Sequence, residues 1–143
     1  MSGGLEQLEP LLGEWTSSSK TYPEGRGRMT VAPTEAGKFV RIESQIEDER
    51  FPRSVQIVGC DDAVEDCTAL YFDSREVHRI YQMRVSDREW KVWRDAPGFN
   101  QRYIGKISAD GKTIAGQWEF SEDGKSWKVD FDLNYAKAAG GHS

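Results

Sequence analysis

The sequence contains few of the residues that form most metal and nucleophilic centres. Among its 143 residues are two histidines, His78 and His142, and two cysteines, Cys60 and Cys67. A metal site needs histidine, cysteine or carboxylate side chains clustered at ligand spacing, and the acidic turn 61–66 lacks the alternating spacing and central glycine of a calcium loop. No Gly-x-Ser-x-Gly nucleophile motif is present. We therefore predict no metal site, and the sequence identifies no catalytic residue.

Long hydrophobic runs and basic clusters are also missing. No segment approaches the roughly 20 apolar residues of a membrane-spanning helix. The 19 lysines and arginines are scattered among 24 acidic residues, which gives a formal net charge of −5. Nucleic acids and anionic membranes are bound by a basic face. We therefore expect neither a nucleic acid nor a membrane as a partner.

The first residues predict a cytoplasmic protein. Segment 1–12 carries glutamates and lacks the basic and apolar regions of a secretion signal. Cysteines are reduced in the cytoplasm, so we expect Cys60 and Cys67 to be free thiols. They flank an acidic turn and could face each other across a hairpin, so a disulfide is the alternative if the compartment is oxidising.

Periodicity predicts an all-β chain. The leucines of segment 5–12 have helical spacing and end before Gly13, which indicates a short N-terminal helix. From Gly13 to Tyr135, strand-like segments alternate with turn signals at short intervals. Short connections force neighbouring strands to run antiparallel, because a parallel crossover needs a dozen or more residues. We count about ten strands and predict an antiparallel up-and-down β-barrel.

Turn chemistry and alternation support this fold. Asp110-Gly111 and Asp123-Gly124 each fall between two strand-like segments, where glycine tolerates positive φ. Within segment 40–46, alternate residues are mostly apolar, and segment 127–135 follows the same rule, with these residues on one face: Trp127, Val129, Phe131, Leu133 and Tyr135. Closure into a barrel removes exposed edge strands. We expect one domain, residues 1–137, and a flexible tail, residues 138–143.

The predicted interior mixes aromatic and polar side chains. A plain core face is uniformly aliphatic, whereas a pocket wall combines aromatic bulk with a few polar groups. Four same-face pairs fit a pocket wall: Tyr71 with Asp73, Arg79 with Tyr81, Trp93 with Asp95, and Gln101 with Tyr103. From them we predict the ligand-binding residues Tyr71, Asp73, Arg79, Tyr81, Trp93, Gln101 and Tyr103.

Two of these assignments have alternatives. An acidic group beside aromatic rings is costly unless it pairs with an arginine or a ligand, and Asp73 could instead cap the turn 73–76. Trp90 and Val92 lie on the face opposite Trp93, so the register of this strand is ambiguous. An outward tryptophan could pack against a second subunit, which makes a homodimer an alternative.

The segment Gly13-Glu14-Trp15, at the start of the first strand, resembles the Gly-x-Trp opening of the lipocalins and their calycin relatives. In that group the tryptophan closes the base of the barrel and a basic side chain from a late strand lies over it. The resemblance makes Lys137 the candidate for this cation–π contact. The leucine-rich lead-in and ten-strand pattern are more similar to bacterial nitrobindin-like proteins, as are segments 70–75 and 93–99.

The resemblance fails at the cofactor. Nitrobindins hold haem through a histidine on a late strand near the C-terminus, and segment 127–137 contains none. His78 lies on a middle strand, where a single hydrogen bond would satisfy it, and His142 lies in the tail. Haem is therefore disfavoured, and we expect no cofactor.

We predict a barrel that binds a small apolar or aromatic molecule in its interior. The alternative is a barrel enzyme, such as a cyclase, isomerase or hydrolase acting on an apolar metabolite, because one or two polar groups in a shaped pocket suffice for acid–base chemistry. A structural or protein-binding module with a filled barrel is the third interpretation.

Overall fold

The computed structural model describes residues 3–34, 36–48, 50–61 and 63–138. It contains one 3₁₀ helix and eleven strands. In chain order they are η1 (Gly3–Leu11), β1 (Gly13–Ser18), β2 (Gly27–Thr34), β3 (Phe39–Ile46), β4 (Ser54–Cys60), β5 (Cys67–Asp73), β6 (His78–Ser86), β7 (Glu89–Arg94), β8 (Asn100–Ile107), β9 (Thr113–Ser121), β10 (Lys128–Asp132) and β11 (Asn134–Lys137).

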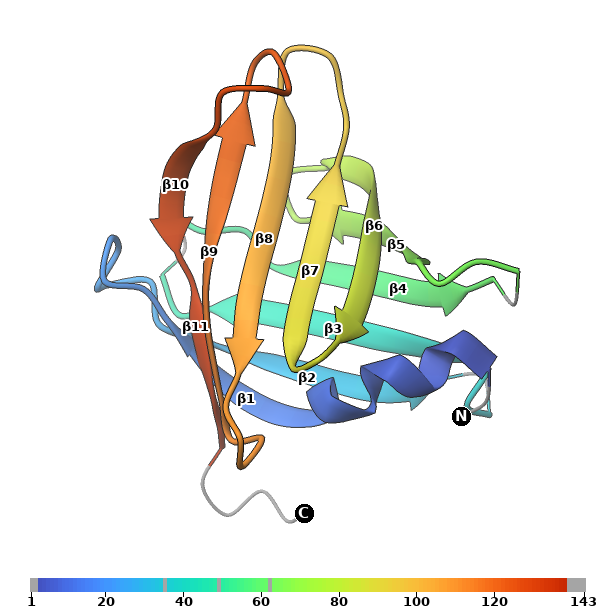
Figure 1. Ribbon diagram of the computed structural model, residues 1–143. Helices are drawn as coiled ribbons and strands as arrows, with labels where there is room; N and C mark the ends of the chain where they lie inside the picture. The colour runs from blue at the N-terminus through green and yellow to red at the C-terminus, as the bar shows by residue number, and fades with distance from the viewer. Residues whose placement is uncertain (1–2, 35, 49, 62, 139–143) are drawn as a thin grey trace.

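The strands form a closed antiparallel barrel of ten strands with one extra strand (Figure 1). Each strand from β1 to β9 pairs with the next one in sequence, and β11 closes the barrel by pairing with both β9 and β1. The predicted up-and-down barrel is therefore confirmed. Gly111 and Gly124 have φ angles of 73° and 78°, as the Asp-Gly turn predictions required.

The tenth position of the barrel is shared by two short strands. Both β10 and β11 pair with β9, but only β11 also pairs with β1. The register of β10 shifts between Val129 and Phe131. A bulge adds one residue to a strand, so the side chains beyond it change face. The predicted single face from Trp127 to Tyr135 is therefore wrong: Val129 is 60% exposed, whereas Phe131 and Tyr135 point inward.

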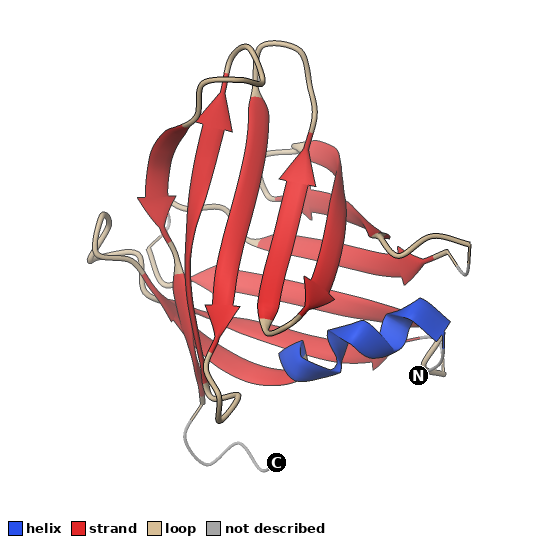
Figure 2. Cartoon of the chain, viewed as in Figure 1, coloured by secondary structure: helices blue, strands red, loops and turns tan. Residues whose placement is uncertain are grey.

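The N-terminal helix covers the base of the barrel, where it contacts β4 and β6 (Figure 2). It is a 3₁₀ helix, and its buried leucines, Leu5, Leu8 and Leu11, recur every three residues, which is the period of that helix. They therefore share one face. No helix in the described part of the chain is long and apolar enough to cross a membrane.

Trp15 is buried beside this helix. Its indole N–H donates a hydrogen bond to the carbonyl of Leu11 over 2.8 Å. The ammonium of Lys137 lies 4.5 Å from the centroid of the Trp15 ring, which confirms the predicted cation–π contact. Ala138 continues from β11 by donating its N–H to the carbonyl of Glu14. The rest of the predicted tail, including His142, lies outside the described residues.

The prediction of two free thiols is wrong for this structure. Cys60 and Cys67 lie directly opposite each other on β4 and β5, and they form a disulfide. The register explains the bond, because it brings their Cα atoms to 4.1 Å. The hairpin arrangement considered as the alternative is therefore the one observed.

Candidate functional site

The barrel encloses a cavity of about 490 Å³. That volume is within the range of roughly 300 to 1,000 Å³ found for small-molecule sites. The cavity extends to the end of the barrel opposite η1. Residues of the connections β1–β2, β3–β4, β5–β6 and β7–β8 line it there. Its lining residues are Ser17, Ser19, Tyr22, Gly25, Met29, Ser44, Ile46, Phe51, Pro52, Ser54, Gln56, Tyr71, Arg75, Arg79, Tyr81, Trp90, Val92, Phe99, Gln101, Tyr103, Trp118, Asp130, Phe131, Leu133 and Tyr135.

One wall of the cavity is aromatic. It comes from β6 to β9, where Tyr81, Trp90, Tyr103 and Trp118 contact one another. The ring centroids of Trp90 and Tyr103 are 5.2 Å apart, and those of Tyr103 and Trp118 are 5.5 Å apart. The interplanar angles of 66° and 49° are far from face-to-face stacking, as expected for aromatic pairs. This wall offers a ligand a broad apolar surface.

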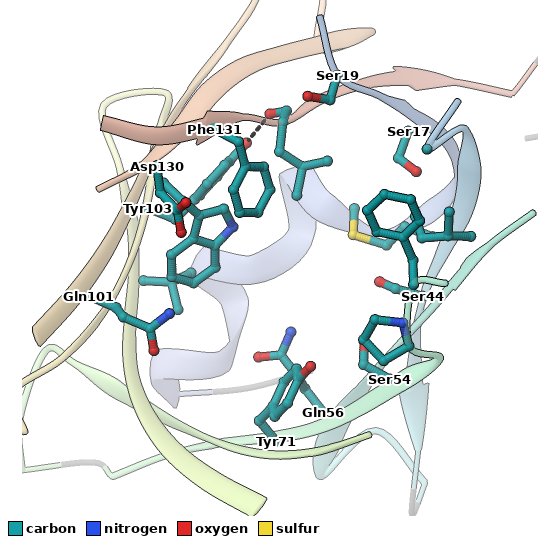
Figure 3. Close-up of a pocket in the computed structure, with 18 of the residues that line it drawn as sticks. Ser17, Ser19, Ser44, Ser54, Gln56, Tyr71, Gln101, Tyr103, Asp130 and Phe131 are labelled. Carbon is teal, nitrogen blue, oxygen red and sulfur yellow. Dashed lines mark hydrogen bonds between the residues drawn. The ribbon is translucent and has the colours of Figure 1, made fainter. Parts of the chain in front are cut away.

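The facing wall carries hydroxyl groups. Ser17, Ser44 and Ser54 come from β1, β3 and β4, and they lie across the cavity from Gln101 and Tyr103 (Figure 3). Ser44 and Ser54 are directly opposite in the register of β3 and β4. Serines thus occupy inward-facing positions, where a plain core would have aliphatic side chains. This wall therefore mixes hydroxyl groups with apolar side chains such as Met29 and Ile46.

The same strands are fully apolar closer to η1. On β3, the inward residues Val40 and Ile42 are buried in the core, and Ser44 follows them two residues further along. On β4, Val58 is buried in the core, whereas Gln56 lines the cavity. A solid core therefore closes the base of the barrel, and the cavity occupies the other half.

The side-chain amide of Gln101 links two other cavity residues, Tyr81 and Arg79. The amide oxygen of Gln101 accepts a hydrogen bond from the Tyr81 hydroxyl over 2.9 Å. It also accepts a longer one, of 3.4 Å, from Nη1 of Arg79. The phenol proton of Tyr81 is thus committed to Gln101, and the amide of Gln101 is held in one orientation.

Asp73, at the end of β5, holds two residues of the cavity lining in place. Its carboxylate accepts a hydrogen bond from the Tyr71 hydroxyl over 2.8 Å and pairs with Nη2 of Arg75 at 2.6 Å. It also accepts the backbone N–H groups of Arg75 and Val77, so it caps the turn as the alternative interpretation proposed. Burial raises the pKa of the Asp73 carboxyl, but the hydrogen bonds from Arg75 and Tyr71 outweigh it and hold that pKa at about 2.

Tyr71 is kept neutral by the same arrangement. Burial, followed by the hydrogen bond to the Asp73 carboxylate, raises the pKa of the Tyr71 phenol above its ordinary value. The phenol proton lies between two oxygens and is not free for a ligand. Tyr71 and Asp73 therefore form a rigid polar support rather than an acid–base pair open to the cavity.

Two polar atoms of the lining residues have no hydrogen-bond partner among the described residues. They are Oε1 of Gln56 and Nε1 of Trp90, both buried. A buried polar group without a partner costs about 1–3 kcal/mol, and such groups are rare in native proteins. One is an acceptor and the other a donor. Neither atom exposes appreciable surface to the cavity in this structure.

Asp132, on β10, connects this strand to the segment after β1 at the mouth of the cavity, where β10 and β1 do not pair. Its carboxylate accepts hydrogen bonds from the backbone N–H groups of Lys20 and Thr21, and from the hydroxyl of Ser19. These bonds, the backbone ones first, lower the pKa of the Asp132 carboxyl. The side chain thereby replaces strand pairing in holding the segment after β1 against the last strands.

Five of the seven predicted ligand-binding residues line the cavity: Tyr71, Arg79, Tyr81, Gln101 and Tyr103. Asp73 is not among the lining residues, but it accepts a hydrogen bond from one of them, Tyr71. Trp93 is not among the lining residues, because Trp90 and Val92 occupy the inward positions of β7. Its ring lies under the ammonium of Lys91, 5.5 Å from the centroid, on the outer face. Ligand binding by these residues, and a homodimer through Trp93, remain predictions.

The sequence reasoning missed the serine wall and the two unpartnered groups. Alternation placed Ser44 inward, but a serine in an alternating strand gives no separate signal for a cavity. Trp90 could be found only by fixing the register of β7, which is apolar on both faces. Gln56 belongs to a strand in which neither face is clearly polar.

The cavity offers no histidine for haem. None of its lining residues is a histidine or cysteine, and His78 is exposed on the outer face, with its ring stacked 4.9 Å from that of Phe72. Over the described ranges, no group of three or more histidine, cysteine, aspartate or glutamate side chains is arranged to hold a metal ion. Comparison of the sequence with protein-family models and with curated proteins finds no match.

Proposed function

We propose that this chain is a lipocalin-like binding protein that holds a small, partly aromatic molecule inside its barrel. The observation that carries the proposal is the cavity of about 490 Å³, whose lining combines aromatic side chains with serine and glutamine side chains. Pockets of this kind, mostly apolar with a few convergent polar groups, are typical of small-molecule sites. The Gly13-Glu14-Trp15 opening and the contact between Trp15 and Lys137 support the lipocalin-like assignment.

The chemistry of the walls describes the ligand. A flat apolar group would lie against the rings of Trp90, Tyr103 and Trp118. Polar substituents would meet the serine hydroxyls on the facing wall. The ligand is therefore amphipathic and not a simple hydrocarbon.

The test is a fluorescence titration with N-phenyl-1-naphthylamine, a neutral aromatic probe that becomes bright in apolar surroundings. The test variant, Ser44→Phe, places a ring inside the cavity, because Ser44 points inward (Figure 3). The matched control, Gln45→Phe, places the same ring on the exposed outer face of the same strand. Wild type and the control should bind the probe alike, and Ser44→Phe should weaken binding by about tenfold or more.

Two results would contradict the proposal. One is the absence of saturable binding by the wild-type protein. The other is an equal loss of affinity in Ser44→Phe and Gln45→Phe, since the probe would then occupy the outer surface. Native mass spectrometry of freshly purified protein gives an independent measurement, because a retained ligand would appear as a mass above that of the chain.

A further inference from the structure

Arg79 lines the mouth of the cavity with most of its hydrogen-bonding capacity unused. A guanidinium carries five N–H donors. In Arg79 one of them makes a long hydrogen bond of 3.4 Å to Gln101, and the group lies 5.7 Å from the ring centroid of Phe99. Within the described parts of the chain, no carboxylate lies within 4.0 Å of it. Its positive charge is not neutralised by a neighbour.

Some arginines of the barrel are paired with acids, whereas Arg28 on β2 and Arg94 on β7, like Arg79, have no ion pair among the described residues. Arg75, at the same mouth, is bound to the Asp73 carboxylate. On other strands, Arg84 pairs with Asp66, and Arg102 pairs with Glu119, at 2.5 Å in both cases. The chain has 24 acidic residues against 19 basic ones, so acids are in excess. Arg79 differs from the other unpaired arginines in that it lines the cavity, where Arg75 is the other arginine and is paired.

The neighbour of Arg79 adds a second donor. The amide oxygen of Gln101 is occupied by Tyr81 and Arg79, which leaves its NH₂ group without an acceptor among the residues that the structure describes. Charge-assisted hydrogen bonds to a carboxylate or sulfonate are about twice as strong as neutral ones. Asp130, the acid that also lines the cavity, is exposed and lies four strands away around the barrel. An anionic group would therefore favour the Arg79 side of the mouth.

We propose that the natural ligand is an organic acid. Its aromatic or apolar body lies against Tyr81, Trp90 and Trp118, and its carboxylate or sulfonate group binds the guanidinium of Arg79 and the amide N–H of Gln101. This inference rests on the proposed function and adds the anionic group that selects among aromatic molecules. It assigns Arg79 as the residue that determines specificity for charge.

Two probes with one ring system test the inference. 8-Anilinonaphthalene-1-sulfonate and N-phenyl-1-naphthylamine share the same rings and differ by the sulfonate. Wild-type protein should bind the sulfonate at least about tenfold more tightly than the neutral probe. Arg79→Gln should raise the Kd of the sulfonate by about tenfold and leave that of the neutral probe within about twofold.

The matched control is Arg41→Gln, which removes the same charge from an exposed position on the outer face of β3. It should leave both affinities unchanged. The sulfonate must also lose affinity in Ser44→Phe, which shows that it binds inside the barrel and not on an outer apolar surface. Circular dichroism and thermal unfolding of each variant establish that the barrel is folded.

The outcomes separate the two proposals. Equal weakening of both probes by Arg79→Gln, or equal affinity of the wild-type protein for both, would overturn the organic-acid inference while binding itself stands. An effect of Arg41→Gln as large as that of Arg79→Gln would also overturn it, because the protein's overall field would then explain the preference. Binding of neither probe would overturn the proposed function and this inference together.

Discussion

The hydroxyl of Tyr103 donates a hydrogen bond to the backbone carbonyl of Leu133, 2.9 Å away. Leu133 is the residue between β10, which does not pair with β1, and β11, which does. Its N–H is bound to the carbonyl of Gly116 on β9. Burial raises the pKa of the Tyr103 phenol, so the hydroxyl keeps its proton for this bond. A side chain of the cavity wall thus stabilises the break in the final strand.

Tyr103→Phe should therefore destabilise the barrel although the ring is retained. The substitution leaves the Leu133 carbonyl without its partner, at a cost of about 1–3 kcal/mol. Urea unfolding followed by tryptophan fluorescence measures the change. The control is Tyr22→Phe, which removes a hydroxyl from an exposed ring and should change stability by less than about 0.5 kcal/mol. Equal stabilities of the two variants would contradict this role of Tyr103.

At the base of the barrel, Gly13 makes room for Lys137. Gly13 has a φ angle of 123°, and a Cβ atom placed on it would lie 2.7 Å from Nζ of Lys137. Gly13→Ala should therefore combine backbone strain of about 1–3 kcal/mol with displacement of the ammonium from Trp15. Gly111→Ala is the control, because its positive φ gives strain and no atom crowds its Cβ.

A double-mutant cycle separates the two costs of Gly13→Ala. In a Lys137→Ala background the crowding is absent, so Gly13→Ala should cost less than in the wild-type protein, by about 1 kcal/mol. Thermal or urea unfolding of the four proteins gives the coupling. Additive effects would show that Gly13 is required for its backbone conformation alone.

The fold was predictable because its signals are local. The Asp-Gly turns fix hairpin positions, and the alternation in β3 fixes which residues point inward. These are the features that decide strand pairing and register, and they required no knowledge of distant contacts. The contact between Trp15 and Lys137 followed only from the family resemblance, since these residues are far apart in sequence.

The candidate site was predictable only where strand register was unambiguous. On β5, β6 and β8, alternation placed Tyr71, Arg79 and Tyr103 on the inner face. On β7, which is apolar on both faces, it gave Trp93 in place of Trp90. The bulge in β10 reversed the face of Val129 without any signal in its residues. The disulfide depends on the exact register of β4 and β5, which turn positions define only to within a few residues.

The disulfide between Cys60 and Cys67 should contribute measurably to stability. It closes a loop with a sequence separation of 7 residues, for which chain entropy gives about 2.5 kcal/mol. Addition of a reductant and the double substitution Cys60→Ser, Cys67→Ser should lower the unfolding midpoint by similar amounts. In the double variant the reductant should have no effect.

The state of these cysteines also bears on where the protein resides. The predicted cytoplasmic location favours reduced thiols, whereas the hairpin geometry allows the bond. Alkylation of the protein in intact cells, followed by mass measurement, counts the free thiols. Two alkylated cysteines would agree with the cytoplasmic prediction, and an unmodified chain would indicate an oxidising compartment.

Asp73 should make stability depend on pH in a defined direction. The pKa of its carboxyl is about 2 in the folded protein, below the ordinary value of 3.8. A lowered pKa means that the folded state favours the ionised form, so its contribution is fully present above about pH 4 and is lost as pH falls toward 2. A shift of this size corresponds to about 2 kcal/mol. Urea unfolding at a series of pH values measures it.

Two variants separate this contribution from that of other carboxylates. Asp73→Asn should be less stable than wild type at pH 7, and the difference in unfolding free energy should shrink as the pH is lowered toward 2. Arg75→Gln removes the guanidinium whose hydrogen bond does most to hold that pKa down, so the Asp73 contribution should be lost at a higher pH than in wild type. A difference between wild type and Asp73→Asn that stays constant from pH 7 to pH 2 would mean that the ion pair with Arg75 does not stabilise the mouth of the cavity.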